Sequence, residues 1–163
     1  SCHGNALHPD PAVAKEHHDA FVNSVKLASK LGVKCVNGFS GCPGDGPEAK
    51  NPNWVTCAWP DEYRQILDWQ WNERVIPYWK EQNSLLGDHG VSYSNHSLLK
   101  LRDAAGEHIG ANFDPSHLWW QGIDPIAAVR ELARAGALYH VHAKDTRIDP
   151  YNSGRNGNLD VIS

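Results

Sequence analysis

One order of elements recurs along this sequence: an amphipathic helical stretch, a glycine, and a short run typical of a β-strand. The helical stretches span 10–31, 97–105 and 124–135, and the strand-like runs that follow them span 33–39, 109–113 and 137–143. Asp followed by Pro is typical of a helix N-cap and first helical residue, and a glycine of a helix C-terminus. This alternation predicts a parallel sheet of α/β type.

The remaining segments fit the alternation less well. The tryptophan-rich stretch 60–90 is helical in pattern, with a kink or break expected at Pro77. A strand should follow Gly90, but barely four residues precede the next helix, so we expect a strand to be missing there. Residues 1–3 resemble the end of a strand, and we expect the polar segment 151–160 to be a loop.

Composition excludes several classes of protein. A formal net charge of −4 argues against a nucleic-acid binder, and no apolar run reaches the ~20 residues of a membrane span. The 163 residues predict one domain, 1–163. The four cysteines form no C-x-x-C pair, so we expect free thiols and a cytoplasmic location, with a Cys42–Cys57 disulfide as the minor alternative.

Polar residues alternate along the last two strand-like runs. Asn112 and Asp114 share one face of the first, and His140, His142 and Lys144 share one face of the second. Ligands bind at the C-terminal ends of the strands in a parallel barrel, where Asp114 and His142 would lie. A carboxylate and an imidazole together suit a divalent metal, and a buried Asp–His hydrogen bond without metal is the alternative.

Two runs closely resemble the sugar phosphate isomerase/epimerase family of xylose isomerase-like TIM barrels. They are 109–125, with Asp114-Pro-Ser-His117, and 139–146, with His140-Val-His-Ala-Lys-Asp145. Segments 1–9, 39–44 and 53–60 look similar to the same branch. The resemblance implies a (β/α)8 TIM barrel, entered near the end of strand three and left after strand seven. The chain would then be incomplete, lacking strands one, two, five and eight.

The resemblance also implies a metal centre. In this family a Glu, an Asp, a His and a second Glu bind a divalent metal, and here Asp114 matches the Asp and His142 the His. His117 matches a His that contacts substrate oxygens beside the metal. Neither glutamate has a counterpart, and with them the acid/base pair is absent. Mn²⁺ is the metal expected first, with Co²⁺, Mg²⁺ or Zn²⁺ as alternatives.

Further residues are candidates for contacts with substrate. His3 lies at an expected strand end, and Trp119 follows His117 in a loop where it can stack on a sugar or simply pack on another tryptophan. Lys144, Asp145 and Arg147 follow the candidate metal ligand and can bind hydroxyls or a phosphate. A salt-bridged loop is the competing interpretation of those three residues.

The reaction implied by the resemblance is proton abstraction next to a carbonyl of a small-molecule sugar or keto-sugar, through an enediolate. Isomerisation and epimerisation are the expected outcomes. A lyase, dehydratase or C-glycoside-cleaving activity and a non-catalytic sugar-binding pseudoenzyme are the alternatives, and a homo-oligomer is left open. Because the resemblance implies that segments of a longer protein are absent from the sequence, we expect a discontinuity in the chain between Gly90 and Tyr93.

Overall fold

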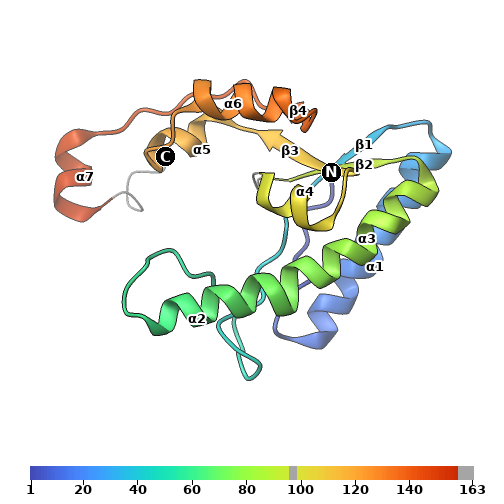
Figure 1. The fold of residues 1–163 in the computed structure, drawn as a ribbon, viewed down its shortest axis with the longest axis horizontal. Helices are drawn as coiled ribbons and strands as arrows, with labels where there is room; N and C mark the ends of the chain where they lie inside the picture. The colour runs from blue at the N-terminus through green and yellow to red at the C-terminus, as the bar shows by residue number, and fades with distance from the viewer. Residues whose placement is uncertain (96–98, 158–163) are drawn as a thin grey trace.

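The computed structural model describes residues 1–95 and 99–157. Helices and strands alternate along most of the chain (Figure 1). The elements are α1 (Pro11–Lys30), β1 (Cys35–Asn37), α2 (Glu62–Trp69), η1 (Gln70–Val75), α3 (Ile76–His89), β2 (Ser92–Asn95), α4 (Leu99–Ala105), β3 (Ile109–Phe113), α5 (Pro115–Trp120), α6 (Pro125–Arg134), β4 (Leu138–Val141) and α7 (Pro150–Asn156). The predicted α/β class is therefore confirmed.

The four strands form one sheet in the order β1-β2-β3-β4, and all neighbouring pairs are parallel. The backbone of Cys2 extends this sheet by a parallel bridge to Gly38 beside β1, which agrees with a strand end at residues 1–3. Four consecutive parallel strands with covering helices match an incomplete (β/α)8 barrel.

The strand expected to be missing after Gly90 is present, which corrects that prediction. Gly90 caps α3 in the left-handed conformation, and the chain continues directly into β2. Ser92 donates its backbone N–H to Lys34 and Tyr93 donates to His108, so β2 joins β1 to β3. The expected discontinuity between Gly90 and Tyr93 is not found. The prediction failed because a strand of four residues is enough to pair on both sides.

Aspartates begin four of the helices. Asp10, Asp114, Asp124 and Asp149 each accept a backbone N–H of the first turn, and each precedes a proline. These contacts satisfy N–H groups that have no partner inside the helix. The fourth pair starts α7, so the expected loop at 151–160 is wrong over Tyr151 to Asn156, and residues 158–160 lie outside the described part.

The helical stretch before β2 changes geometry next to Pro77. A π-helical segment, η1, separates α2 from α3, and Ile76 donates its N–H to Trp71, five residues back. Pro77 itself has no N–H to donate, so a change in the hydrogen-bond pattern at this point has a direct cause. The predicted break is therefore a π-helical turn inside a continuous helical run.

No helix in the described residues has both the length and the apolar character needed to cross a bilayer.

The main core lies between β1, β2 and the helices α1 and α3. Its centre is aromatic: the rings of Trp79 and Tyr93 stack at 4.7 Å, and Phe21 meets both rings edge-on. A smaller cluster of Ala111, Leu132 and Ala137 holds α6 against β3 and β4.

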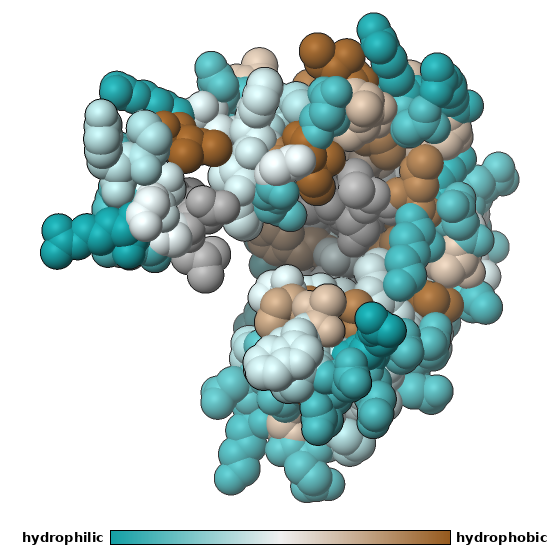
Figure 2. Space-filling model, turned by 60° about the vertical axis from the view of Figure 1, so that its left-hand side comes forward, coloured by the Kyte–Doolittle hydropathy of each residue, from teal (hydrophilic) through white to brown (hydrophobic). Residues whose placement is uncertain are grey.

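On the surface, the face in Figure 2 is hollowed, and its hydrophobic residues are scattered rather than gathered in one patch.

One buried amide fixes the long loop between β1 and α2. The side chain of Gln70 is fully buried; its Nε2 donates to the carbonyls of Gly44 (2.7 Å) and Asn53 (2.9 Å), and its Oε1 accepts from the N–H of Val55 (3.3 Å). Peptide groups buried with the amide would otherwise lack partners. The first residue of η1 therefore holds the loop that leads away from β1.

We expect Gln70→Leu to lower the free energy of unfolding by about 2–4 kcal/mol, because three backbone groups lose their partner. Gln65→Leu on the exposed side of α2 is the matched control and should change stability by less than about 0.5 kcal/mol. Urea denaturation gives both values, and hydrogen exchange should accelerate at residues 44–55 only in Gln70→Leu. Equal losses in the two variants would contradict this role.

Candidate functional site

Polar side chains of β3 and β4 pair across the sheet in two successive rungs. In the first, the Nδ1 atom of His140 lies 2.8 Å from Oδ1 of Asn112; in the second, Nδ1 of His142 lies 3.2 Å from Oδ2 of Asp114. The rings of His140 and His142 meet edge-on at 5.2 Å. The second rung lies at the C-terminal ends of two adjacent parallel strands, where the sequence predicted the ligand site.

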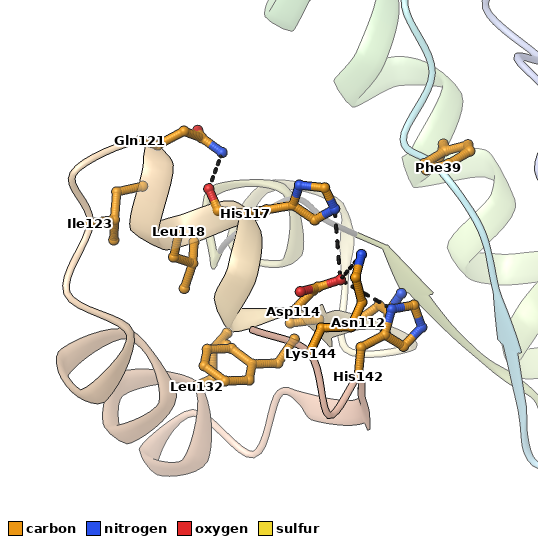
Figure 3. Close-up of a pocket in the computed structure, with 12 residues that line it drawn as sticks. Phe39, Asn112, Asp114, His117, Leu118, Gln121, Ile123, Leu132, His142 and Lys144 are labelled. Carbon is orange, nitrogen blue, oxygen red and sulfur yellow. Dashed lines mark hydrogen bonds and ion pairs between the residues drawn. The ribbon is translucent and has the colours of Figure 1, made fainter. Parts of the chain in front are cut away.

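The carboxylate of Asp114 uses its two oxygens differently. Oδ1 accepts from the backbone N–H of Ser116 (3.0 Å) and from its hydroxyl (2.6 Å), and so caps α5. Oδ2 faces three nitrogen atoms (Figure 3): Nδ1 of His142 and Nζ of Lys144, both at 3.2 Å, and Nε2 of His117 at 3.7 Å. One buried oxygen thus brings together side chains from β3, α5 and the segment after β4.

This surrounding sets the ionisation of Asp114. Burial alone would raise the pKa of the carboxyl, but hydrogen bonds from Ser116, Lys144 and His142 outweigh burial and lower the net pKa well below its usual range. Asp114 is therefore a carboxylate at neutral pH, although its side chain is almost entirely buried. A buried anion needs a partner, and a bound cation can take this role as well as nitrogen donors can.

A cavity of about 490 Å³ opens beside this carboxylate. It is polar around Asp114 and apolar farther away, between α5 and α6. Its lining consists of Phe39, Ala111, Asn112, Phe113, Asp114, His117, Leu118, Gln121, Ile123, Leu132, His142 and Lys144. Figure 3 shows Phe39 standing apart from the other lining side chains, on the segment that follows β1. A cavity of this volume is within the range of small-molecule sites.

The predicted site residues divide into two groups. Asp114, His117, His142 and Lys144 line the cavity together. His3, Trp119, Asp145 and Arg147 are exposed and are not in its lining. His3 lies against Phe39, with ring centroids 5.2 Å apart, and so approaches the cavity from the β1 side.

Several residues of the site were not singled out as site residues from the sequence. Ser116 anchors Asp114, and the Asp-Pro pair that marks an N-cap elsewhere in the chain was the available signal for this contact. Asn112 and His140 were each noted as polar positions of an alternating strand, but alternation within one strand does not show that the two side chains pair. Phe39 and Gln121 carry no comparable signal, because only the folded chain brings them to the cavity.

Asp114 and His142 offer a carboxylate and an imidazole, which are ligand types that divalent metals accept. Two neighbouring ligands of one ion, each about 2.1 Å from it, lie roughly 3.0 Å apart in octahedral and 3.4 Å apart in tetrahedral geometry. The observed 3.2 Å between Oδ2 and Nδ1 falls between these values and is also the length of the hydrogen bond between the two groups. Within residues 1–95 and 99–157, no group of three or more His, Cys, Asp or Glu side chains is arranged to hold a metal ion. The donor set is thus suitable but partial.

The sequence matches known proteins over nearly its whole length. Residues 1–160 match the model of the xylose isomerase-like TIM barrel family. The uncharacterized protein YfiH of Bacillus subtilis is 42% identical over 175 aligned positions, which cover 99% of this chain and 55% of that protein. The rhizopine catabolism protein MocC of Rhizobium meliloti is 39% identical over 70 residues, 42% of this chain and 21% of that protein.

Solved structures show the same fold. A xylose isomerase domain protein from Planctomyces limnophilus superposes with a TM-score of 0.59 at 16% identity, over 92% of this chain and 48% of its own. A D-tagatose 3-epimerase-like protein gives a TM-score of 0.56 at 17% identity, over 88% and 53%. The chain thus spans about half the length of YfiH and of these structures. The YfiH alignment is longer than the 163 residues of the chain, so YfiH has residues within the matched region that the chain lacks.

We expect Asp114→Asn to destabilise the metal-free protein by about 1.5–3 kcal/mol at pH 7, because interactions of a charged group with His142, Lys144 and Ser116 are weakened while an N-cap is kept. Since the pKa of Asp114 is lowered in the folded state, its contribution is complete above the ordinary pKa of about 3.9. The contribution is lost as the pH falls toward the folded pKa, so the two proteins should converge in acid.

Urea denaturation between pH 7 and pH 2.5 measures this difference. Asp124→Asn, which keeps an N-cap on α6, is the matched control and should resemble the unmodified protein at pH 7. A constant difference between Asp114→Asn and the unmodified protein across the whole pH range would refute the charge-based explanation.

Proposed function

This chain belongs to the xylose isomerase-like TIM barrel family, and we propose that it acts in divalent-metal-dependent isomerisation or epimerisation of a sugar. The observation that carries the proposal is the Asp114–His142 pair, which lies in a cavity at the C-terminal ends of adjacent parallel strands. The likeness to a D-tagatose 3-epimerase-like protein supports the same class of substrate. The proposed activity is that of a whole protein, because the relative YfiH is about twice as long as this chain.

Asp114 would hold the metal through Oδ2 and His142 through Nδ1. The proposed cation is Mn²⁺, with Co²⁺, Mg²⁺ and Zn²⁺ accepted by the same kind of ligand. When bound, the ion supplies Lewis-acid stabilisation of negative charge that develops on substrate oxygens. The Ser116 contacts keep Oδ1 occupied, so Oδ2 is the oxygen of Asp114 that would bind the ion.

His117 is proposed to contact a substrate oxygen. Its Nδ1 lies 3.4 Å from Nε1 of Trp120, which can only donate. In the neutral ring this leaves the proton on Nε2, the nitrogen on the side of Asp114. From there His117 can donate a hydrogen bond to an oxygen held beside the carboxylate, and it orients that oxygen without occupying the place of a metal ligand.

Lys144 is proposed to place positive charge beside the same substrate oxygens. Its ammonium group contacts Oδ2 of Asp114 at 3.2 Å, while half of its side chain is exposed. A long, half-exposed lysine can exchange one oxygen partner for another at small cost. His3, Trp119, Asp145 and Arg147 stay proposed as contacts to substrate. Because they lie outside the lining of the cavity, these contacts would be at its periphery.

Proton abstraction is assigned to no residue of this chain. In the described residues, Asp114 is the only carboxylate that lines the cavity, and its lowered pKa makes it a weak base. The family resemblance implies a glutamate at the end of β2. The sequence has no Asp or Glu between Asp88 and Asp103, the stretch that contains this strand end. A lyase, dehydratase or C-glycoside-cleaving activity would use the same binding groups.

A second candidate is a non-catalytic sugar-binding protein of the same family. The incomplete set of metal ligands among the described residues favours this candidate. The two functions differ in their need for metal, because a sugar can be bound by hydrogen bonds alone while charge development on a carbonyl oxygen calls for an electrophile.

We expect the full-length protein to bind Mn²⁺ stoichiometrically and to lose it when Asp114 or His142 is replaced by Ala, because each removes a proposed ligand. His108→Ala is the matched control, since His108 lies beside Gly87 on α3 and outside the lining of the cavity. Isothermal titration with MnCl₂ measures the stoichiometry. No metal binding by the unmodified full-length protein would exclude the metal-dependent function and favour the sugar-binding protein.

We expect His117→Ala to impair turnover far more than metal content, because His117 contacts substrate in this proposal. A residue that only supports a metal ligand would instead weaken metal binding about 10–100-fold when lost. Metal occupancy and steady-state rates of the full-length variant are measured side by side. If the variant loses metal but regains normal rates when metal is added back, His117 supports the ion and does not touch substrate.

A further inference from the structure

The pairing between β3 and β4 contains one irregular step. Ala111 pairs with Leu138, but the next residue, Asn112, pairs with His140, so the chain advances by one residue on β3 and by two on β4. Tyr139 is the extra residue and has no counterpart on β3. This arrangement is a β-bulge, a feature that changes the direction of side chains and is frequent next to active sites.

The bulge decides which side chains of β4 meet Asp114. In a regular parallel ladder after Ala111 and Leu138, Asn112 would lie beside Tyr139, and Asp114 would lie beside Val141. A shift of one residue moves every following side chain to the other face of a strand. With the bulge, His140 meets Asn112 and His142 meets Asp114, so both rungs of the site depend on the step at Tyr139.

The side chain of Tyr139 is held by two hydrogen bonds of its hydroxyl group. Its hydroxyl accepts from Nη1 of Arg102 at 2.8 Å and donates to the carbonyl of Glu107. Arg102 also donates to the carbonyl of Ile109 and lies 5.6 Å from the centre of the Tyr139 ring. The loop before β3 and the helix α4 therefore fix the position of the hydroxyl.

The ring of Tyr139 also needs the space that Gly110 leaves. A Cβ atom at Gly110 would come within 2.2 Å of Cδ2 of Tyr139, far closer than any real contact. The backbone of Gly110 is not in the left-handed region, so its glycine is required for this close approach and not for its backbone conformation. The ring cannot simply move aside, because its hydroxyl is bound at the other end.

We propose that Tyr139 is a positioning residue: clamped by Arg102, Glu107 and Gly110, it fixes the bulge that turns His140 and His142 toward Asn112 and Asp114. The inference rests on the proposed function only for the use made of His142, which is metal binding. The register itself is a property of the protein without metal.

Two variants test the clamp in the full-length protein. Tyr139→Phe keeps the ring against Gly110 and removes both hydroxyl contacts, and Gly110→Ala displaces the ring. We expect the affinity for Mn²⁺ to fall about 3–10-fold in Tyr139→Phe and about 10–100-fold in Gly110→Ala. Tyr151→Phe and Gly46→Ala are the matched controls, because Tyr151 is exposed and nothing lies within 4 Å of a Cβ atom at Gly46. Both controls should bind Mn²⁺ normally.

The double variant Gly110→Ala/Tyr139→Ala separates a clamp from simple packing. It removes the clash but does not restore the clamp, so the affinity for Mn²⁺ should stay low. Normal Mn²⁺ binding by this variant, or by Tyr139→Phe, would overturn the proposal. If Gly110→Ala fails to fold, Tyr139→Phe alone decides the outcome.

Imidazole ¹⁵N signals of the metal-free protein distinguish this proposal from the proposed function. The Nδ1 signals of His140 and His142 should change together in Tyr139→Phe and stay unchanged in Tyr151→Phe. If the unmodified protein binds no Mn²⁺, the metal-dependent function is wrong, while a joint change of both signals still supports the clamp. Unchanged signals in Tyr139→Phe would overturn the clamp, whatever the result for metal.

Discussion

The carboxylate of Asp114 is the group on which the site depends, because it ends one strand, begins one helix and faces the next strand at once. Its Oδ1 is committed to the first turn of α5 through Ser116, and its Oδ2 to His142 and Lys144. A buried carboxylate without such partners would lower the stability of the fold strongly. The start of α5, the register of β4 and the conformation of the segment after β4 are therefore coupled through one side chain.

The same requirement explains the character of one whole face of the sheet. Asn37 of β1 accepts from the hydroxyl of Ser94 on β2 at 2.5 Å. Asn112 of β3 pairs with His140 of β4, and Asp114 and His142, one residue beyond each strand, pair in the same way. Val36, Tyr93, Ile109 and Ala111 lie in the apolar clusters. Since buried polar groups need partners, polar side chains on neighbouring strands pair with one another along the sheet. A sheet divided in this way can place charged groups at its C-terminal edge without opening the apolar core.

Much of the fold could be predicted from the sequence because its signals are local. Asp-Pro pairs and terminal glycines delimit α1 and α6 closely, and the alternation in β3 and β4 placed Asp114 and His142 on facing sides. Asp149 and Pro150 carry the same signal, and they start α7 inside the polar segment for which the sequence predicts a loop. β2 is not predicted because it is short and pairs on both sides with strands that are distant in the sequence. The bulge at Tyr139 could not be predicted, since strand alternation within β4 does not show how β4 aligns with β3.

The division of the site into local and distant parts follows from this architecture. Asp114, His117, His142 and Lys144 all come from the start of α5, directly after β3, and from the chain just after β4, so their arrangement depends on two strands and one helix cap. A complete metal shell and a proton-transferring pair would require side chains from strands farther round a barrel. The bulge and the cap fix the two binding atoms relative to each other, whatever the distant side chains are. The metal binding proposed for Asp114 and His142 can therefore be tested separately from the proton transfer proposed for the whole protein.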